Sequence, residues 1–437
     1  MKYYSTNKKT PAVSLEQAVI QGLASDKGLF MPEEIPSLPA EFFEKIDQLS
    51  FQEMAYVVAS AFFGQDVPAK DLKKIVYETL TFEVPLVRIT PQISALELFH
   101  GPTLAFKDVG ARFMARLLGY FTQKREAADE QDIHVLVATS GDTGSAVANG
   151  FLGVQGVKVH VLYPKGKVSE IQEKQFTTLG RNITALEVEG TFDDCQALVK
   201  NAFMDQELNE HLFLTSANSI NVARFLPQSF YYFYAYAQLK KEGKSDSVVM
   251  CVPSGNFGNI TAGLFAKQMG LPIKRFIAAN NKNDVFYQYL QTGNYEPRPS
   301  IATIANAMDV GDPSNFARIL DLFGNSHKAI SNQISGTYYL DDQIKKTIQK
   351  VWSECGYLLD PHGACGYQAL VDLLQEGEQG VFLETAHPAK FLDTVESIID
   401  ESVEIPNKLQ TFMKGEKQSL SIGKDFNSFK SYLLTLE

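Results

Sequence analysis

The stretch VVMCVPSGNFGNITAGLFAKQMG, residues 248–270, joins a short apolar run to a glycine-bracketed turn and then to a helical pattern. Residues 134–151, HVLVATSGDTGSAVANGF, repeat this construction. β-branched runs at 157–163 and 183–189 also alternate with amphipathic helical patterns. We therefore predict strands at 134–139, 157–163, 183–189 and 248–253. Continuous apolar strands followed by helices predict an α/β fold with parallel sheets covered on both faces.

The N-terminal part of the chain has a different pattern. Segments 15–24, 51–63 and 70–80 carry apolar residues at three- and four-residue spacing, and a proline-broken loop lies at 31–41. We predict three parts: a helical N-terminal region at 1–90, a smaller α/β domain at 91–225 and a larger α/β domain at 226–437. These boundaries are approximate, and such a chain can cross between domains.

Composition excludes several classes of protein. The net charge of −11 is spread over 437 residues without a basic cluster, which argues against nucleic acid or an anionic membrane as a partner. No apolar run is long enough to span a bilayer, and the first residues lack the apolar core of a signal peptide. We expect a cytoplasmic protein.

The cysteines indicate neither a disulfide framework nor a zinc cluster, because Cys195, Cys251, Cys355 and Cys365 show no CxxC spacing. We predict free, buried thiols. His362 lies close to Cys365 and could form a metal-binding pair with it, but no other His or Cys stands at ligand spacing. The sequence therefore predicts no metal site.

A candidate nucleophile lies in HGPTLAFKD, residues 100–108, where Lys107 follows an apolar run. A buried ammonium group is costly unless its pKa falls or it loses its charge, for example as a Schiff base with an aldehyde. Alone this signal is weak, since most lysines lay their methylene groups on apolar surface and keep the nitrogen in water.

Both glycine-bracketed turns are candidate anion-binding sites. Each combines backbone N–H groups at a helix start with glycines that permit close approach and with side-chain donors. Tight strand-to-helix turns have a similar composition, so for either turn alone the two interpretations are balanced. Neither turn matches the GxGxxG or GxxxxGK[ST] nucleotide motif. The residues concerned are Ser140, Gly141, Thr143, Gly144, Ser254, Gly255, Gly258 and Asn259.

A further polar cluster, TSANSINVARF at 215–225, contains Asn218, Ser219, Asn221 and Arg224. Arg224 could pair with a phosphate or carboxylate while the Asn and Ser side chains add donors. A helix cap followed by a solvated arginine is the alternative, and by itself the cluster favours that alternative. Near the C-terminus, LETAHPAKF (383–391) places Thr385 at another strand-to-loop exit.

Taken in order, HGPTLAFKD, TSGDTG, NSINVAR, PSGNFGN, DPHGA and ETAHPAKF resemble threonine synthase, a fold-type II enzyme that uses pyridoxal 5′-phosphate (PLP). YYSTN and ASDKGLFMP near the N-terminus resemble the opening of the same family, so the resemblance covers most of the chain. The full set is similar to the branch found in many bacteria and fungi. It implies a tryptophan synthase β-like fold, with two open, mostly parallel twisted sheets flanked by helices and a helical N-terminal region.

The resemblance implies roles for individual residues. Lys107 matches the catalytic lysine that holds PLP, so the smaller domain would carry it together with the substrate loops. Thr385 matches the hydroxyl that meets the pyridine nitrogen. The cofactor phosphate would lie in the larger domain, on Ser254, Gly255, Asn256, Phe257, Gly258 and Asn259. The substrate carboxylate would meet Ser140, Gly141, Asp142 and Thr143, and the substrate phosphate Asn218, Ser219, Asn221 and Arg224. Shorter threonine synthases carry Asn where this chain has Asp142, which leaves the role of Asp142 open.

The implied reaction is the conversion of O-phospho-L-homoserine and water to L-threonine and phosphate, by γ-elimination and β-addition of water, as the last step of threonine biosynthesis. One alternative is another fold-type II PLP lyase acting on a phosphorylated or hydroxy amino acid, either a phospho-lyase or a dehydratase. Another is a phosphate-binding module without catalysis. A monomer is the expectation at the level of the family.

Overall fold

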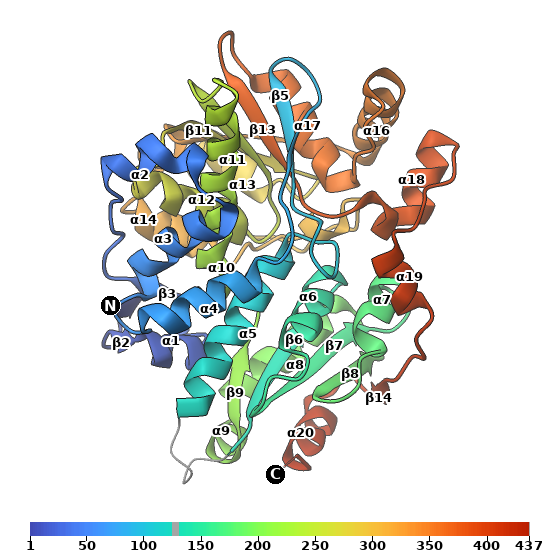
Figure 1. Ribbon diagram of the computed structural model, residues 1–437. Helices are drawn as coiled ribbons and strands as arrows, with labels where there is room; N and C mark the ends of the chain where they lie inside the picture. The colour runs from blue at the N-terminus through green and yellow to red at the C-terminus, as the bar shows by residue number, and fades with distance from the viewer. Residues whose placement is uncertain (125–130, 437) are drawn as a thin grey trace. The chain divides into compact units, whose positions relative to one another are not determined.

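The computed structural model describes residues 1–124 and 131–436 and divides the chain into two compact units (Figure 1). Unit 1 consists of Met1, Met31–Phe106 and Phe225–Glu404. Unit 2 consists of Lys2–Phe30, Lys107–Arg224 and the chain from Ile405 onward. The chain therefore passes between the units several times.

Within its described residues, unit 1 contains a six-stranded sheet in the order β12-β11-β10-β13-β5-β4. Neighbouring strands are parallel, except that β4 runs antiparallel to β5 at one edge. β10 is buried along its whole length, as expected for a strand covered on both faces. The strands are β4 (Leu86–Arg88), β5 (Ile93–Glu97), β10 (Val248–Pro253), β11 (Ile273–Asn280), β12 (Ile334–Tyr338) and β13 (Gln379–Glu384).

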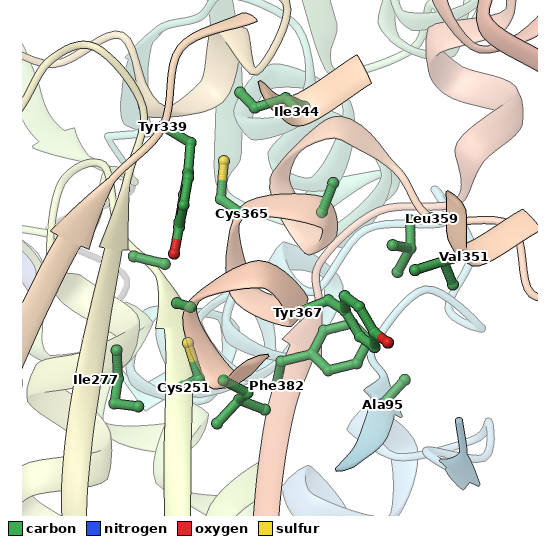
Figure 2. Close-up of a cluster of buried hydrophobic side chains, with 14 of the residues drawn as sticks. Ala95, Cys251, Ile277, Tyr339, Ile344, Val351, Leu359, Cys365, Tyr367 and Phe382 are labelled. Atoms are coloured by element: carbon green, nitrogen blue, oxygen red, sulfur yellow. The ribbon is translucent and has the colours of Figure 1, made fainter. Parts of the chain in front are cut away.

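Helices cover this sheet, and one apolar core cluster of unit 1 lies between the sheet and helices α16 and α17. Figure 2 shows Tyr367 of α17 beside Phe382 of β13, with ring centroids 5.9 Å apart. The helices are α2 (Ala40–Lys45), α3 (Phe51–Phe63), α4 (Ala69–Thr79), α11 (Ser229–Lys241), α12 (Gly258–Gln268), α13 (Val285–Thr292), α14 (Phe316–Leu322), α15 (His327–Ser331), α16 (Asp341–Cys355), α17 (Pro361–Leu373) and α18 (Leu392–Ile399). Short 3₁₀ turns are η1 (Ile46–Gln48), η3 (Leu226–Gln228), η4 (Asn306–Met308) and η5 (Pro388–Phe391).

Unit 2 has a second sheet, which in the described part of the chain has the order β14-β8-β7-β6-β9 and is parallel throughout. Leu136 and Ala138 of β6 lie in an apolar cluster with residues of helices α8 and α20. Helix α6 also packs against β6 and lies beside α5 (Figure 1). The strands are β6 (Ile133–Ala138), β7 (Val157–Pro164), β8 (Ile183–Val188), β9 (Phe213–Ser216) and β14 (Leu420–Ile422). The helices are α1 (Leu15–Gln21), α5 (Lys107–Lys124), α6 (Asp142–Phe151), α7 (Glu170–Thr177), α8 (Phe192–Met204), α9 (Gln206–His211), α19 (Asn407–Met413) and α20 (Phe426–Leu434).

The N-terminal helices begin where the sequence places N-cap residues. Ser14 and Ser50 each accept a hydrogen bond from the third backbone N–H of α1 and α3, and Gln17 and Glu53 complete the two capping boxes. Strands β1 (Lys2–Ser5) and β2 (Val13–Ser14), which pair antiparallel, were not predicted, because a four-residue strand carries little periodic signal. β3 (Phe30–Pro32) and α10 (Val222–Phe225) lie where the chain passes from unit 2 to unit 1.

The predicted fold class is confirmed: two mostly parallel sheets are flanked by helices, and helices dominate the N-terminal region. The strand predicted at 248–253 has those bounds, and those predicted at 134–139, 157–163 and 183–189 end within one residue of the observed ends. The prediction of buried thiols was wrong for Cys355, which is exposed at the C-terminus of α16, whereas Cys195, Cys251 and Cys365 are buried. No helix within the described residues has the length and apolar character of a membrane span.

The compact units differ from the three consecutive domains expected at 1–90, 91–225 and 226–437. Residues 31–90 belong to unit 1, because α3 packs against α11, and the passage after Arg224 falls one residue from the expected boundary. The C-terminal residues from Ile405 belong to unit 2, where β14 extends the sheet beside β8 and α19 packs on α7. Packing between segments far apart in sequence, which local patterns do not report, decides this division.

Candidate active site

The predicted cofactor residues of unit 1 lie at one edge of its sheet. β10 and β13 are adjacent and parallel, so their carboxyl ends meet at the same edge. The 254–259 loop follows β10 directly, and Thr385 follows β13 directly. The structure therefore brings these two predicted parts of the site to one edge.

The start of the 254–259 loop is fixed by backbone contacts. The Ser254 N–H donates to the Ala279 carbonyl oxygen (2.8 Å), and Asn280 Nδ2 donates to the Ser254 carbonyl oxygen (2.8 Å). A Cβ atom on Gly255 would lie 2.6 Å from the Ala307 carbonyl oxygen. Position 255 therefore requires glycine because another backbone segment passes against it.

The loop ends in a left-handed turn. Phe257 has φ +62° and precedes α12, and its ring centroid lies 4.6 Å from that of Phe286. A left-handed conformation is unfavourable for a non-glycine residue, so the surroundings must hold it. The turn leads into the N-terminus of α12, where unpaired backbone N–H groups and the helix dipole favour an anion.

The two asparagines of the loop have different partners. Asn256 anchors the loop: its Oδ1 accepts from the Ser314 N–H (2.7 Å), and its carbonyl oxygen accepts from Asn315 Nδ2 (3.0 Å). Asn259 Oδ1 accepts from the Tyr232 hydroxyl (2.7 Å), while its Nδ2 is buried and has no hydrogen-bond partner among the described residues. A buried amide donor at the start of α12 fits a phosphate group, because an unsatisfied buried donor is costly without an acceptor.

Thr385 is buried at the exit of β13, where its backbone pairs with the segment before Lys107. Its carbonyl oxygen accepts from the Phe106 N–H (2.8 Å), and the Leu104 carbonyl oxygen accepts from the His387 N–H (3.1 Å). The Tyr231 hydroxyl donates to the Phe106 carbonyl oxygen. Phe106, the residue next to Lys107 in the chain, is thus held on both sides.

In unit 2, Lys107 is the first residue of α5 and is half-buried, and Asp108 beside it is fully buried. One turn later, a Cβ atom on Gly110 would collide with the carbonyl oxygen of Arg224. The glycine lets the first turn of α5 lie directly against the backbone of Arg224. This contact places the start of α5, which carries Lys107, against the backbone of Arg224 within unit 2. Lys107 and Arg224 are both predicted site residues.

The predicted substrate loops of unit 2 also share a sheet edge, because β6 and β9 are adjacent and parallel. After β6, the Thr139 hydroxyl accepts hydrogen bonds from the N–H groups of Gly141 (2.9 Å) and Gly144 (2.8 Å). Gly141 has φ +141°, which favours glycine. Ser140 and Thr143 are half-buried beside this turn.

Asp142 is buried as the first residue of α6, where the helix dipole favours a carboxylate. Its Oδ1 accepts from Gln172 Nε2 (2.9 Å), and a Cβ atom on Gly141 would also meet the Gln172 side chain. Gln172 was not a sequence candidate, since nothing in its local sequence distinguishes it. One oxygen of Asp142 is thus oriented by an amide from α7.

Asn221 is fully buried, and its amide groups bind other parts of unit 2. Its Nδ2 donates to the carbonyl oxygens of Val19 (2.8 Å) and Ser216 (3.2 Å), and its Oδ1 accepts from the Ala223 N–H (3.0 Å). Asn221 therefore connects α1 to the loop after β9 through hydrogen bonds. Its predicted contact with the substrate stays a prediction.

The other predicted site residues of the 215–225 cluster lie near Asn221 in the chain. Arg224 is almost fully buried, and its N–H donates to the Asn221 carbonyl oxygen (3.0 Å). Asn218 and Ser219 are half-buried. The alternative of a solvated arginine is wrong, because the Arg224 side chain is withdrawn from solvent.

The sequence analysis did not predict a buried group of ionisable residues that includes Glu384, the residue before Thr385. Asp360 Oδ1 lies 2.5 Å from His362 Nδ1, and the Glu384 Oε1 accepts from the Asp360 N–H (2.7 Å). Since His362 Nε2 accepts from the Ala307 N–H (3.1 Å), Nδ1 carries the proton and donates to Asp360. Burial, and then the nearby Asp360 carboxylate, raise the pKa of Glu384 well above its ordinary value. The DPHGA motif was the available signal for this group.

The suggested pairing of His362 with Cys365 in a metal site has no support in the geometry. His362 is occupied by Asp360 and Ala307, and Cys365 Sγ donates to the Pro361 carbonyl oxygen (3.5 Å). Within the part of the chain that the structure describes, no three or more His, Cys, Asp or Glu side chains are grouped so that they could hold a metal ion.

Comparison with known proteins identifies relatives of the chain. The family described as pyridoxal-phosphate dependent enzyme matches residues 85–383, threonine synthase N terminus matches 2–80, and threonine synthase, C-terminal matches 363–433. A threonine synthase from Serratia marcescens is 45% identical over 436 residues, covering 100% of both chains. The crystal structure of threonine synthase from Escherichia coli is similar with a TM-score of 0.92 and 42% identity, covering 100% of each chain. A PLP-bound threonine synthase structure from Brucella melitensis has a TM-score of 0.91 and 36% identity, covering 99% of this chain and 98% of that one.

Proposed function

Because the chain belongs to the threonine synthase family of PLP-dependent enzymes, we propose that it converts O-phospho-L-homoserine and water to L-threonine and phosphate. The observation that carries this proposal is the pair of sheet edges, each with a glycine turn and buried polar groups suited to an anion. A reaction that uses a phosphorylated cofactor and a phosphorylated substrate needs two phosphate sites. A simple dehydratase needs one.

We assign the cofactor to Lys107 and to residues of unit 1. When bound, PLP withdraws electrons from the substrate Cα and stabilises negative charge there. The 254–259 loop would hold its phosphate, with the buried Asn259 Nδ2 as one donor, and the hydroxyl of Thr385 would meet its pyridine nitrogen. A hydroxyl at this position does not force the nitrogen to be protonated, unlike a carboxylate.

Lys107 would hold the cofactor, and its free amine would remove the proton from the substrate Cα and deliver a proton at Cγ. Its place at the start of a packed helix, after the fixed Phe106, limits the positions that its amine can reach. Precise placement matters because both proton transfers need heavy atoms within hydrogen-bond distance.

We assign the substrate to the loops of unit 2. Ser140, Gly141 and Thr143 receive its carboxylate, and Ser219 and Arg224, with Asn218 beside them, bind its phosphate. The buried position of Arg224 supports this role, since a guanidinium group shielded from water binds a phosphate strongly. We further propose that the protein acts as a monomer in the cytoplasm.

The test is incubation of the purified protein with O-phospho-L-homoserine and measurement of L-threonine, phosphate and 2-oxobutyrate. We expect equal amounts of threonine and phosphate with little 2-oxobutyrate. A main product of 2-oxobutyrate would support the dehydratase alternative and refute the proposal.

Lys107→Ala is the matched test of the cofactor assignment. It removes the amine but not the fold, so we expect loss of turnover and of the borohydride-sensitive visible absorption, with an unchanged far-ultraviolet circular dichroism spectrum. Appreciable threonine production by this variant would show that another residue holds the cofactor.

A further inference from the structure

Arg318 is a buried cation that no step of the proposed reaction uses. It lies in α14 of unit 1, is 0% exposed, and is among the largest fully buried side chains. Its guanidinium carbon lies 4.0 Å from the ring centroid of Phe225, a cation–π arrangement. Burial lowers its pKa to about 9, which still leaves it charged at neutral pH. A buried charge is expensive, so this position calls for an explanation.

A chain of hydrogen bonds connects Arg318 to the 254–259 loop. Arg318 Nη1 donates to Asn315 Oδ1 (2.6 Å), and Asn315 Nδ2 donates to the Asn256 carbonyl oxygen (3.0 Å). The backbone N–H groups of Ser314 and Asn315 donate to Asn256 Oδ1 (2.7 Å) and to its carbonyl oxygen (3.3 Å). Asn256 precedes Phe257, the residue in the left-handed conformation.

Donor and acceptor chemistry fixes the direction of this chain. Arginine only donates hydrogen bonds and a carbonyl oxygen only accepts them. Asn315 must therefore present its Oδ1 to Arg318 and its Nδ2 to Asn256. Without the guanidinium group, the buried Oδ1 of Asn315 loses this donor, which helps to fix the orientation of the amide.

A second arginine of unit 1, the partly buried Arg275, provides a contrast. Arg275 donates to both carboxylate oxygens of the buried Glu378, at distances of 3.1 and 2.6 Å. It lies near the amino end of β11, whereas the 254–259 loop follows the carboxyl end of β10, which is parallel to β11. Arg275 thus forms an ordinary structural ion pair, while Arg318 donates to an amide that leads to the loop.

We propose that Arg318 is a positioning residue for the cofactor phosphate: through Asn315 it fixes Asn256, and so holds the 254–259 loop in the conformation that binds the phosphate of PLP. The buried charge adds to the preference of this region for an anion. The proposal rests on the assignment of this loop to the cofactor phosphate under "Proposed function".

The test compares two ligands that differ only in the phosphate. Full-length protein is stripped of cofactor and titrated with PLP and with pyridoxal, which lacks the phosphate, and binding is followed by visible absorption. For Arg318→Met we expect about 10- to 100-fold weaker PLP binding, the range of one hydrogen bond to a charged group. Pyridoxal binding is expected to change less than about threefold. In the PLP complex, the ³¹P resonance of the phosphate is expected to shift.

Two further variants keep the proposal falsifiable. Asn315→Asp can still accept a hydrogen bond from Arg318 but lacks the donor to Asn256, so it is expected to weaken the binding of PLP more than the binding of pyridoxal. This variant tests the proposal even if Arg318→Met does not fold. The control Arg275→Met breaks the ion pair with Glu378 and lowers the melting temperature without changing the ratio of PLP to pyridoxal affinity.

Equal losses for both ligands in Arg318→Met or in Asn315→Asp would overturn the positioning role, because general destabilisation does not discriminate by phosphate. Failure of the loop assignment is distinguishable: the wild-type protein would then bind PLP no better than pyridoxal, whatever the effect of Arg318.

Discussion

Glu384 gives a sharp prediction about stability and pH. It is the last residue of β13 and is fully buried, and its carboxyl group lies beside that of Asp360 at the start of α17. Gly363 of α17 approaches so closely that a Cβ atom there would collide with the Glu384 carboxyl group. Burial and then the Asp360 charge raise the pKa of Glu384 well above its ordinary value of 4.5. We expect Glu384→Gln, a neutral replacement of similar shape, to stabilise the protein at neutral and alkaline pH.

The sign follows from proton linkage. Above pH 4.5 the unfolded chain loses the Glu384 proton while the folded chain retains it. The free energy of unfolding of the wild-type protein therefore falls as the pH rises, until the raised folded-state pKa is reached. The fall amounts to at most about 1.4 kcal/mol per pH unit. The free energy of unfolding of Glu384→Gln does not fall in this way. The variant is therefore expected to become more stable relative to the wild type as the pH rises.

The assay is urea unfolding of the wild-type and variant proteins at pH 6, 7 and 8, with the difference in unfolding free energy plotted against pH. Glu378→Gln is a matched control just before the same strand. Burial alone would raise the pKa of Glu378, but hydrogen bonds from Arg275 and its neighbours lower it to about 2. Glu378 is ionised in the folded and the unfolded chain over this pH range. The stability lost in Glu378→Gln is therefore expected to be independent of pH.

Parallel curves for Glu384→Gln and the wild type, or an advantage that shrinks as the pH rises, would refute the reasoning. Either result would mean that Glu384 is ionised in the folded protein, with its charge compensated by groups other than those described.

Three further predictions concern the two units. Arg224→Ala is expected to raise the KM for the phosphorylated substrate by about 10- to 100-fold, the range for a charged hydrogen bond, with little change in PLP affinity; equal losses would mean that the two phosphate sites are wrongly assigned. Gly255→Ala brings a methyl group within 2.6 Å of the Ala307 carbonyl oxygen, so more cofactor should be lost on dialysis, and wild-type retention would contradict the close approach. Burial, and then the neighbouring His134, lower the pKa of His160 to about 3; the unfolded chain therefore takes up a proton below pH 6.5 that the folded chain does not, and His160→Gln should lose less stability than the wild type between pH 7 and 5.

Much of the fold could be predicted because its signals are local. The strand at 248–253 is continuously apolar and ends at a proline and a glycine turn, which determine its bounds without help from the rest of the chain. The capping boxes at Ser14 and Ser50 likewise mark helix starts within four residues of sequence. Strand order could not be predicted in this way. β13 enters the sheet between β10 and β5, and nothing near residue 380 specifies those neighbours.

The candidate site shows the same division. The glycine turns and Lys107 could be proposed as site residues because the motifs that single them out lie in consecutive residues. Asn221 is predicted to contact the substrate, and only the structure shows that its amide also donates to the carbonyl oxygen of Val19, about 200 residues earlier in the chain. Gln172 and Arg318 carried no signal, because each acts on a loop through a contact that only folding creates.

The sequence by itself therefore determined the fold class and the positions of the strand-to-helix turns. It also predicts anions at those turns and site roles for the lysine and threonine in segments 100–108 and 383–391. Hydrophobic period, helix capping and glycine turns are short-range properties, which neighbouring residues suffice to specify. Only the tertiary structure decided which turns share a sheet edge, which asparagines are already used to hold loops, and where Glu384 and Arg318 are buried. Those outcomes depend on desolvation and on partners distant in the chain, and both arise only when the sheets and helices pack.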